Sequence, residues 1–576
     1  MQDSNFVRIL KADVVVVGGG AAGCYAALKL KRRGIEPLIV CKGWVGKSGA
    51  SIFAGNLVLS GNLLGNTDAE ARNTAEFLIR YHNQFLIDQH WARRCGKWIE
   101  QVYYPELEEA GLYFRRDDVG NIVTSPGKIR SVAANVQGNS GVPFMDLRRK
   151  QVIKAGIQRL EETTVTALLQ RADGSIGGVF GLDYLRGEYI VVHARAVVLA
   201  TGYSDRLHFR STGTREMSAD GVAMAWRVGA RMSNLEMQWW HTNDAAQPAS
   251  WQRMQVYPNP MLGSEKSARM VNSWGEEFFN QQVDDPLAFG PYTVQLKALV
   301  KQVRAGKARY DGGYFAGFDH CTAAEVEAYT SYAKGYKQLG LRFPEDLLET
   351  AVTAHYRQGG VDVDNRSMRS SVPGLYVAGG LGGHSNGLIA LATYDGEVVA
   401  DGVAGDFDAL STTPPDSDRL QAEERRLEQL RVSKGDLTPT VIKETLRRIM
   451  WDHVGVEKDG AGLTKALEAI QRIKVELLPR LNISFEGRTA NYEWLDAIDL
   501  VNMIEASELI VLSSLERTES RGPFMRGDFP DTDNEYWLAA NVMIRTGNGC
   551  RFERRTYETP FIQPGFSSCK NLEVPW

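Results

Sequence analysis

Three glycines close to the amino terminus have the spacing of a phosphate-binding turn. Gly18, Gly20 and Gly23 form the pattern G-x-G-x-x-G directly after four valines, residues 14–17. In such a turn the first glycine permits a tight bend, the second lets the backbone approach a pyrophosphate, and the third lets helix pack on strand. The chemistry predicted from this spacing is the binding of a dinucleotide at the N-terminus of a helix.

The elements that must position these glycines follow in the expected order. The valine run predicts a strand buried on both faces, residues 21–30 a helix that Gly34 ends, and residues 37–40 a second strand. A glycine-rich turn in any α/β domain is the plainer alternative, but the complete order favours a dinucleotide. One departure concerns the end of the second strand, where such folds place an acidic residue for a ribose hydroxyl. This chain has Cys41 and Lys42 there.

Length and composition restrict the classes of function. The 576 residues suffice for about two to four domains, and 43% hydrophobic and 24% charged residues are typical of a globular protein. A net charge of -4 without a long basic run argues against a nucleic-acid partner. No stretch approaches the roughly 18 apolar residues that span a bilayer, and the first ten residues lack the pattern of a secretory signal. We therefore expect a cytoplasmic protein that does not itself span a membrane.

The cysteines argue against a metal centre within the chain. All six are scattered without a C-x-x-C pair, which predicts reduced thiols and excludes an obvious zinc or iron–sulfur site. They are Cys24, Cys41, Cys95, Cys321, Cys550 and Cys569.

Further strand-like stretches predict an FAD-binding, Rossmann-like α/β domain of the two-dinucleotide type. Residues 189–203 and 374–383 are apolar and β-branched before glycines, and residues 388–404 favour a helix. Helical periodicity returns after the linker-like residues 411–418 and continues to about residue 515. The predicted organisation is an FAD-binding domain in two parts, an inserted capping domain and a mainly helical C-terminal domain. These parts comprise residues 1–245 and 350–405, residues 246–349, and residues 406–576.

Over nearly its whole length the chain resembles the flavoprotein subunits of succinate dehydrogenase and fumarate reductase, with L-aspartate oxidase as a relative. Matching segments include "VVVVGGGAAG", "ARAVVLATG", "SADGVAMAWRVGA", "LEMQWWHT" and "VPGLYVAGG". The most specific is "SLERTESRGPFMRGDFPDTDN", a signature of the family's helical domain. The resemblance implies bound FAD, a capping domain that closes over the flavin and a helical C-terminal domain.

The resemblance also implies which residues bind FAD and how the cofactor is held. Members with covalent flavin have a histidine where this chain has Gly49, within "GKSGASIFAGN", so we expect non-covalent FAD. The resemblance also accounts for Lys42 at the end of the second predicted strand, because the dehydrogenase branch of the family often has Ser-Lys at this place instead of an acidic residue. The residues expected to bind FAD are Gly18, Gly20, Ala22, Gly23, Lys42, Ser48, Gly49, Ala50, Gly55, Ala167, Ala200, Thr201, Gly202, Asp220, Gly379, Gly380, Asn386 and Leu388.

Two histidines match positions at which the family binds substrate. His241 lies in "QWWHTND" and His355 in "HYRQGG", and within these motifs we expect both to be catalytic rather than structural. The nearby tryptophans at 239, 240 and 251 could form an aromatic pocket or simply the core of the capping domain.

The family's two arginines are missing. Tyr292 or Pro291 occupies the place of the proton-transferring arginine, and Tyr292 could supply a proton if Arg269, Lys266 or Lys297 lowered its pKa. The loop that grips a substrate carboxylate in the family is shortened here to "GGHSNGLIA", which offers His384 and Asn386 instead. Neither side chain can replace a bidentate guanidinium at similar strength.

The sequence therefore predicts an FAD-dependent oxidoreductase that exchanges hydride between flavin N5 and a small organic substrate other than succinate or fumarate. The resemblance implies that electrons pass to a separate iron–sulfur subunit in a hetero-oligomer. The alternatives are a non-catalytic flavoprotein and a flavin subunit like that of adenylylsulfate reductase.

Overall fold

The computed structural model describes most of the 576 residues. The described ranges are 7–55, 57–60, 68–114, 116, 118–120, 130–132, 140–252, 268–279, 292–327, 335–342, 344–384, 387–547 and 549–572.

A five-stranded parallel sheet holds the glycine turn. Its order is β18-β10-β2-β3-β6, and each neighbouring pair runs parallel. The strands are β2 (Val14–Val17), β3 (Pro37–Val40), β6 (Gln158–Leu160), β10 (Ala196–Leu199) and β18 (Leu375–Val377). The predicted strands at 14–17 and 37–40 are confirmed, as is the assembly of a nucleotide-binding sheet from distant segments. The predicted helix is α1 (Ala21–Arg32), which connects β2 to β3.

A second sheet lies beside the first and is mostly antiparallel. Its order is β1-β9-β8-β7, and β8 packs on β10 of the parallel sheet. The strands are β1 (Val7–Lys11), β7 (Thr163–Gln170), β8 (Ile176–Asp183) and β9 (Glu188–His193). The apolar stretch at 189–203 is therefore two strands, β9 and β10, in different sheets.

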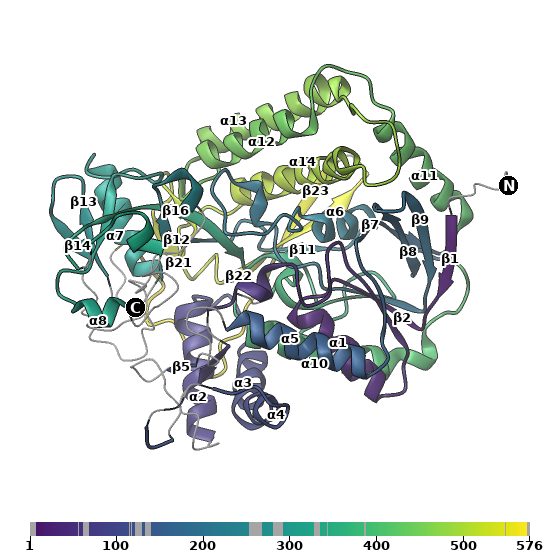
Figure 1. Cartoon of the computed structure of the whole chain (residues 1–576), viewed down its shortest axis with the longest axis horizontal. Coiled ribbons are helices and arrows are strands. Elements are labelled where there is room, and N and C mark those ends of the chain that lie inside the picture. Colours follow the sequence, from purple (N-terminus) through teal and green to yellow (C-terminus); the bar gives the residue numbers. More distant parts are fainter. Residues whose placement is uncertain are drawn as a thin grey trace.

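Helices cover the parallel sheet and extend the same hydrophobic core. α1 packs against α5 (Gly141–Lys154) and α10 (Ile389–Asp406), and the three run together in Figure 1. Three helices lie beyond them, α2 (Asp68–Phe77), α3 (Gln89–Trp98) and α4 (Tyr104–Glu109). β4 (Val58–Ser60) and β5 (Arg130–Val132) form a small ladder beside α2.

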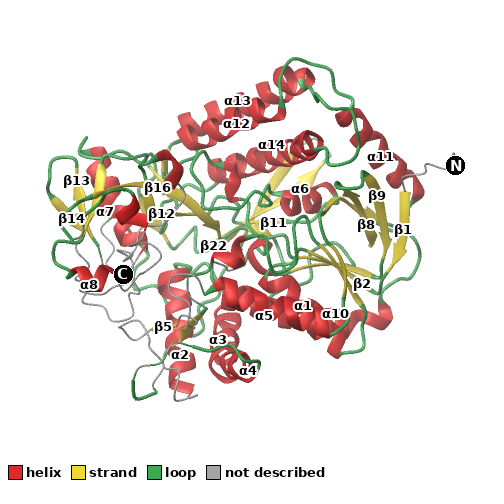
Figure 2. Ribbon diagram, viewed as in Figure 1, coloured by secondary structure: helices red, strands yellow, loops and turns green. Residues whose placement is uncertain are grey.

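The segment expected to cap the flavin contains a sheet of its own. Its order is β12-β16-β15-β13-β14, at the left of Figure 2, and α7 (Tyr292–Arg304) packs on β12 and β14. The strands are β12 (Gln238–Ala245), β13 (Arg269–Asn272), β14 (Glu277–Phe279), β15 (Tyr314–Gly317) and β16 (Leu348–Arg357). The short helix α8 (Ala323–Glu327) follows β15. Because β12 and β16 flank the insertion, the sheet extends past residues 246–349 on both sides, and the domain boundaries stay a prediction.

The C-terminal region is helical as expected and then forms strands. Its helices, at the top of Figure 1, are α11 (Ser417–Arg431), α12 (Pro439–His453), α13 (Gly460–Arg472) and α14 (Tyr492–Glu516). A four-stranded sheet, β17-β11-β22-β23, joins the chain's last part to the FAD-binding part. It consists of β11 (Met232–Ser233), β17 (Gly360–Val361), β22 (Ala539–Thr546) and β23 (Gly549–Thr556). The remaining strands pair as β19 (Glu457–Lys458) with β20 (Met525–Arg526) and β21 (Asp531–Asp533) with β24 (Ser568–Lys570).

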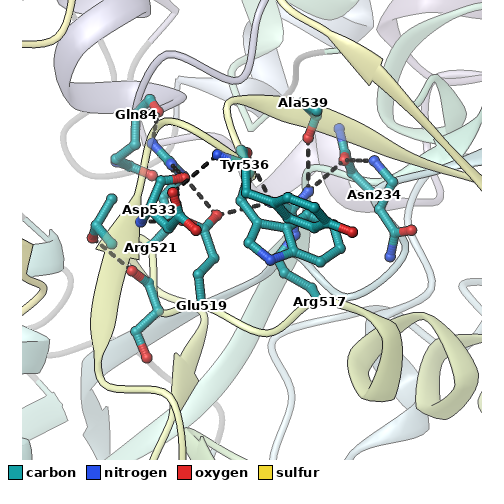
Figure 3. Close-up of polar contacts among 12 residues, drawn as sticks. Gln84, Asn234, Arg517, Glu519, Arg521, Asp533, Tyr536 and Ala539 are labelled. Carbon is teal, nitrogen blue, oxygen red and sulfur yellow. Dashed lines mark hydrogen bonds and ion pairs between the residues drawn. The ribbon is translucent and has the colours of Figure 1, made fainter. Parts of the chain in front are cut away.

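The signature segment after α14 forms a buried ionic network, drawn in Figure 3. Arg517 donates to Glu236 at 2.5 Å and to Glu519 at 2.8 Å, and Arg521 donates twice to Glu519 at 2.8 Å. All four side chains are buried. Each charge is thus paired, as burial requires, and the network ties the end of α14 to the segment after β11.

In the described part of the chain, no helix combines the length and the apolar character needed to cross a bilayer.

Candidate active site

The glycine turn is built so closely that two of its positions accept only glycine. Gly18 has φ +116°, and a Cβ there would lie 2.2 Å from the carbonyl oxygen of Ala200. A Cβ on Gly23 would lie 2.0 Å from the carbonyl oxygen of Gly18. The turn therefore packs against β10, and α1 packs against the turn, as the motif predicts.

Gly20, by contrast, borders open space at the N-terminus of α1. It is the N-cap of the helix, and the only described atom within 4 Å of an added Cβ would be Oγ of Ser51, at 3.2 Å. The N–H of Ala21 donates to the same Oγ at 3.1 Å. A helix N-terminus with this open approach fits a pyrophosphate, so the site fits the expected FAD. Ser51 was not among the predicted residues, although it lies in the "GKSGASIFAGN" segment.

The ends of three parallel strands meet beside this turn. Ala200, Thr201 and Gly202 follow β10, while Gly379 and Gly380 follow β18. A Cβ on Gly379 would lie 2.9 Å from Cβ of Ala22 in α1, and one on Gly380 would lie 2.3 Å from the Tyr203 ring. Thr201 in turn lies against Gly221, at the start of α6 (Asp220–Arg227). The structure thus gathers this part of the predicted FAD set at one edge of the sheet, where ligands of open α/β sheets bind.

Lys42 and Asp220, both predicted to bind FAD, form an ion pair with each other. The Lys42 ammonium also donates to Asp499 of α14 at 2.8 Å and to Ser218 at 2.8 Å, and Asn502 donates to Asp220 at 2.8 Å. Burial lowers the pKa of Lys42 and the two carboxylates raise it, with a net rise. Burial is also the main reason that the pKa of Asp499 rises to about 6.

Other predicted FAD residues lie in the segments around this site. Ser48 donates to the carbonyl of Trp44 at 2.9 Å, and Gly49 has φ +77° with open space around a Cβ. Ala50 begins a short 3-10 turn, and Gly55 follows that turn. Ala167 lies half-buried in β7, which packs on α6, and Leu388 is the N-cap of α10. Asn386 lies outside the described residues. The role of each residue in binding stays a prediction.

The structure brings His241 and His355 together. They lie on the neighbouring antiparallel strands β12 and β16, and their ring centroids are 3.6 Å apart with the planes tilted by 33°. Burial lowers the pKa of His355 to about 4. Burial, followed by repulsion from His355, holds the pKa of His241 well below its usual value. Both imidazoles are therefore neutral at pH 7 and can offer hydrogen bonds without adding charge.

His384 does not share the contacts of the histidine pair and instead packs against Asp395 and Trp91. It is buried, its Nε2 lies 3.1 Å from Oδ1 of Asp395 in α10, and its ring packs edge-on against Trp91. The other oxygen of Asp395 accepts the N–H of Gly379 at 3.0 Å. These contacts place His384 beside the strand end after β18, and its predicted catalytic role stays a prediction.

The replacements expected for the missing arginines are only partly described. Tyr292 is the first residue of α7, and nothing is described of its side chain; Pro291 and Lys266 lie outside the described residues. Lys297 lies on α7, where burial holds its pKa well below the usual value for lysine. Arg269, the first residue of β13, is paired with Glu277 and Asp319.

Two other arginines lie near the histidine strands, and each is already bound. Arg357, at the end of β16, is buried and donates to Ser204 at 3.1 Å, to Gln238 at 2.7 Å and to the carbonyl of Leu235. Arg210 is buried and pairs with Asp244 of β12. The sequence predicts neither set of contacts, because no pattern links Arg210 with Asp244, 34 positions away, or Arg357 with Gln238, 119 positions away.

The tryptophans pack mainly as core. Trp240 is buried in the cluster that includes Leu296 and Leu299 of α7, and Trp251 packs on Tyr336. Trp239 differs, because its ring stacks on both Tyr356 and His82 in an aromatic cluster beside His355.

Comparisons with known proteins agree with this architecture. The family model for an FAD binding domain matches residues 13–393, and that for the fumarate reductase flavoprotein C-terminus matches residues 443–568. A fumarate reductase (CoM/CoB) subunit from Methanothermobacter marburgensis is 26% identical over 542 residues, covering 92% of this chain and 96% of that protein. L-aspartate oxidase of Streptomyces coelicolor is 25% identical over 572 residues, covering 96% and 95%. Among solved structures, the Mycobacterium smegmatis Sdh1 complex superposes with a TM-score of 0.82 at 25% identity, covering 96% of each chain.

Proposed function

Because the chain belongs to the FAD-binding flavoprotein family of fumarate reductase and succinate dehydrogenase, it is an FAD-dependent oxidoreductase, and we propose that its substrate is a small organic molecule other than succinate or fumarate. When bound, FAD supplies hydride transfer at its N5 atom. The residues at the α1 turn and at the ends of β10 and β18 would hold the cofactor. In our proposal it is not covalently attached, since Gly49 offers no nucleophile.

The observation that supports this proposal is a close pair of neutral histidines without the family's two arginines. His241 and His355 match the family's substrate-binding positions, and their 3.6 Å ring separation lets both contact one small molecule. The guanidiniums of Arg210, Arg269 and Arg357 are each bound to carboxylate or amide and backbone oxygens. A dicarboxylate would therefore lose the bidentate contacts that recognise it best.

In this proposal the two histidines hold and orient the substrate. A neutral imidazole donates one hydrogen bond and accepts another, so the pair, of which His241 is buried and His355 half-buried, can position an oxygen atom of the substrate. Tyr292, at the start of α7, is the proposed proton donor in place of the missing arginine.

We further propose that electrons pass to a separate iron–sulfur protein. Within the described residues none of the six cysteines forms a disulfide, and four of them are buried. The similar protein of Methanothermobacter marburgensis is one subunit of its enzyme, and the Mycobacterium smegmatis structure is a complex. These observations support a hetero-oligomer in which a second subunit accepts electrons from the flavin.

The proposal is tested by assaying fumarate reduction and succinate oxidation with artificial electron carriers. Each lost charged contact costs on the order of 2 to 4 kcal/mol in the transition state. Two losses should slow fumarate turnover by about 10³- to 10⁶-fold relative to family enzymes, at about 1.4 kcal/mol per tenfold. Turnover of fumarate at rates typical of the family would overturn the proposal.

A second measurement separates a catalytic protein from a flavoprotein that only binds FAD. A panel of candidate substrates is added anaerobically to the yellow protein, and bleaching of the flavin identifies a reductant. His241→Ala and His355→Ala should each abolish bleaching by that compound while retaining flavin absorbance. Rapid peroxide formation with oxygen alone would contradict the proposal that electrons pass to an iron–sulfur protein.

A further inference from the structure

Thr212 lies beside His355 because its backbone is attached to the histidine's strand. The segment after β10 runs parallel to β16 at Ser211, which pairs with Ala354. The N–H of Thr212 donates to the carbonyl of Ala354 at 3.0 Å, and the N–H of Ala354 donates to the carbonyl of Arg210 at 3.1 Å. These two hydrogen bonds place the Thr212 side chain next to the residue that follows Ala354.

The hydroxyl of Thr212 makes a short contact with one ring nitrogen of His355. Its Oγ1 lies 2.7 Å from Nδ1, whereas its other described acceptor, the carbonyl of Ala354, is 3.4 Å away. Hydrogen bonds from O–H donors are commonest at about 2.7 to 2.8 Å, whereas those from N–H donors are commonest at about 2.9 to 3.0 Å. The 2.7 Å separation is usual for an O–H donor and short for an N–H donor, so it favours Thr212 as the donor and Nδ1 as the acceptor.

A neutral histidine has one ring proton, so an acceptor at Nδ1 determines where that proton lies. Burial lowers the pKa of His355 to about 4, and the ring is neutral at pH 7. With Nδ1 accepting from Thr212, the single proton must lie on Nε2. The ring then presents an N–H on the side away from Thr212, and the His241 ring lies next to it with its plane tilted by 33°.

We propose that Thr212 is a positioning residue that holds His355 as its Nε2–H tautomer, so that His355 donates a hydrogen bond to an oxygen of the substrate. This inference rests on the proposed function, in which His355 contacts substrate. It narrows the substrate class to molecules that present an acceptor, such as a carbonyl or carboxylate oxygen, at this histidine. An orienting partner of this kind sets which nitrogen of a functional histidine is protonated.

The test is nitrogen NMR of the FAD-loaded protein with ¹⁵N-labelled histidine at pH 7, without substrate. The chain has nine histidines, and the His355 signals are assigned by their loss in His355→Gln. We expect a protonated Nε2 and an unprotonated Nδ1 in the wild type. A protonated Nδ1 would overturn the proposal, because Thr212 would then be the acceptor.

Three variants test whether Thr212 sets the tautomer. Thr212→Val should raise the share of the Nδ1–H form about 2- to 10-fold, the effect of one neutral hydrogen bond, and Thr212→Ser should restore the wild-type ratio. Thr214→Val is the matched control, since that buried hydroxyl has no hydrogen-bond partner within the described residues, and it should leave the ratio unchanged. An unchanged ratio in Thr212→Val would refute the role. If Thr212→Val fails to fold, the wild-type and Thr212→Ser spectra still decide the tautomer.

This readout needs no turnover, so it is independent of the substrate assays. A failed tautomer prediction leaves the redox proposal intact, whereas rapid fumarate turnover would remove the proposed substrate class without changing the spectrum.

Discussion

Replacing Gly20 with valine should empty the FAD site without unfolding the protein. Gly20 has φ −80° and ψ −167°, an extended conformation that valine adopts readily. Only Oγ of Ser51, at 3.2 Å, lies within 4 Å of the new Cβ among the described atoms. The valine methyl groups would then occupy the approach to the N–H groups at the start of α1.

The size of the effect follows from the hydrogen bonds that would be lost. Each N–H donor to a charged pyrophosphate oxygen contributes about 1.5 to 3 kcal/mol. Losing two of them should raise the Kd for FAD by about 100- to 10,000-fold, at about 1.4 kcal/mol per tenfold. Flavin absorbance per protein after gel filtration measures occupancy, and titration of apoprotein with FAD measures Kd.

Two further glycine variants separate loss of FAD from loss of fold. Gly405→Val makes the same change near the end of α10, where a Cβ meets nothing within 4 Å, and it should retain flavin. Gly18→Ala combines φ +116° with a 2.2 Å clash and should destabilise even the apoprotein. Apo Gly20→Val should melt near the wild-type temperature. Full flavin occupancy in Gly20→Val would show that the pyrophosphate does not lie at this turn.

Three other outcomes follow from the same structure. Acid precipitation should release the flavin, because Gly49 provides no attachment point, and flavin retained in the precipitate would contradict this. Glu519→Gln leaves Arg517 with Glu236 alone and removes the carboxylate that pairs with the buried Arg521, so it should lower the free energy of unfolding by about 3 to 5 kcal/mol. Glu553→Gln, in an exposed pair, should change the free energy of unfolding far less in the same denaturant titration. Burial raises the pKa of Asp205 to about 8, so the folded chain keeps a proton that the unfolded chain releases near pH 4. Stability should therefore fall by about 1.4 kcal/mol per pH unit between about pH 4 and 8 through this group, and Asp205→Asn should remove that slope; equal slopes in both proteins would refute it.

The nucleotide-binding elements could be predicted because their signals are local. Residues 14–17 and 37–40 are short apolar runs beside glycine or proline, and the structure has strands with these bounds. The stretch at 189–203 shows the limit of such signals. Both strands have apolar, β-branched centres, and only Ala194 and Arg195 separate a strand of the antiparallel sheet from one of the parallel sheet. Hydrophobicity alone cannot tell which sheet buries a strand.

The capping sheet was missed for a related reason. Its strands β13, β14 and β15 have only three or four residues each, too few to establish a period of two. After residue 515, β22 and β23 have eight residues each, but the exposed face of β23 is rich in charge and gives little apolar signal. Some of these strands also depend on distant partners, since β15 pairs with β16 and β22 pairs with β11.

In the candidate site, too, residues within local motifs could be predicted and contacts between distant residues could not. His241 and His355 were identified through motifs, but their ring contact depends on the register between β12 and β16, which single-sequence reasoning does not provide. The contacts of Thr212 with His355 and of Arg210 with Asp244 join residues 143 and 34 positions apart. Side-chain pairs at such separations leave no periodicity in the sequence, so only the folded chain reveals them.

The lysine at the end of β3 shows how distant parts of the chain complete one site. Lys42 stands where dinucleotide-binding folds place an acid for the ribose, and the structure surrounds its ammonium with Asp220 of α6 and Asp499 of α14. Asp220 also accepts from Asn502, one turn further along α14. The strand end itself has no acidic residue, but the carboxylate of Asp220, at the start of α6, lies beside it. Through Asn502, α6 is in turn bound to α14. The basic residue at that strand end therefore has its charge compensated by α6 and α14, and the roles of Lys42 and Asp220 in binding FAD stay predictions.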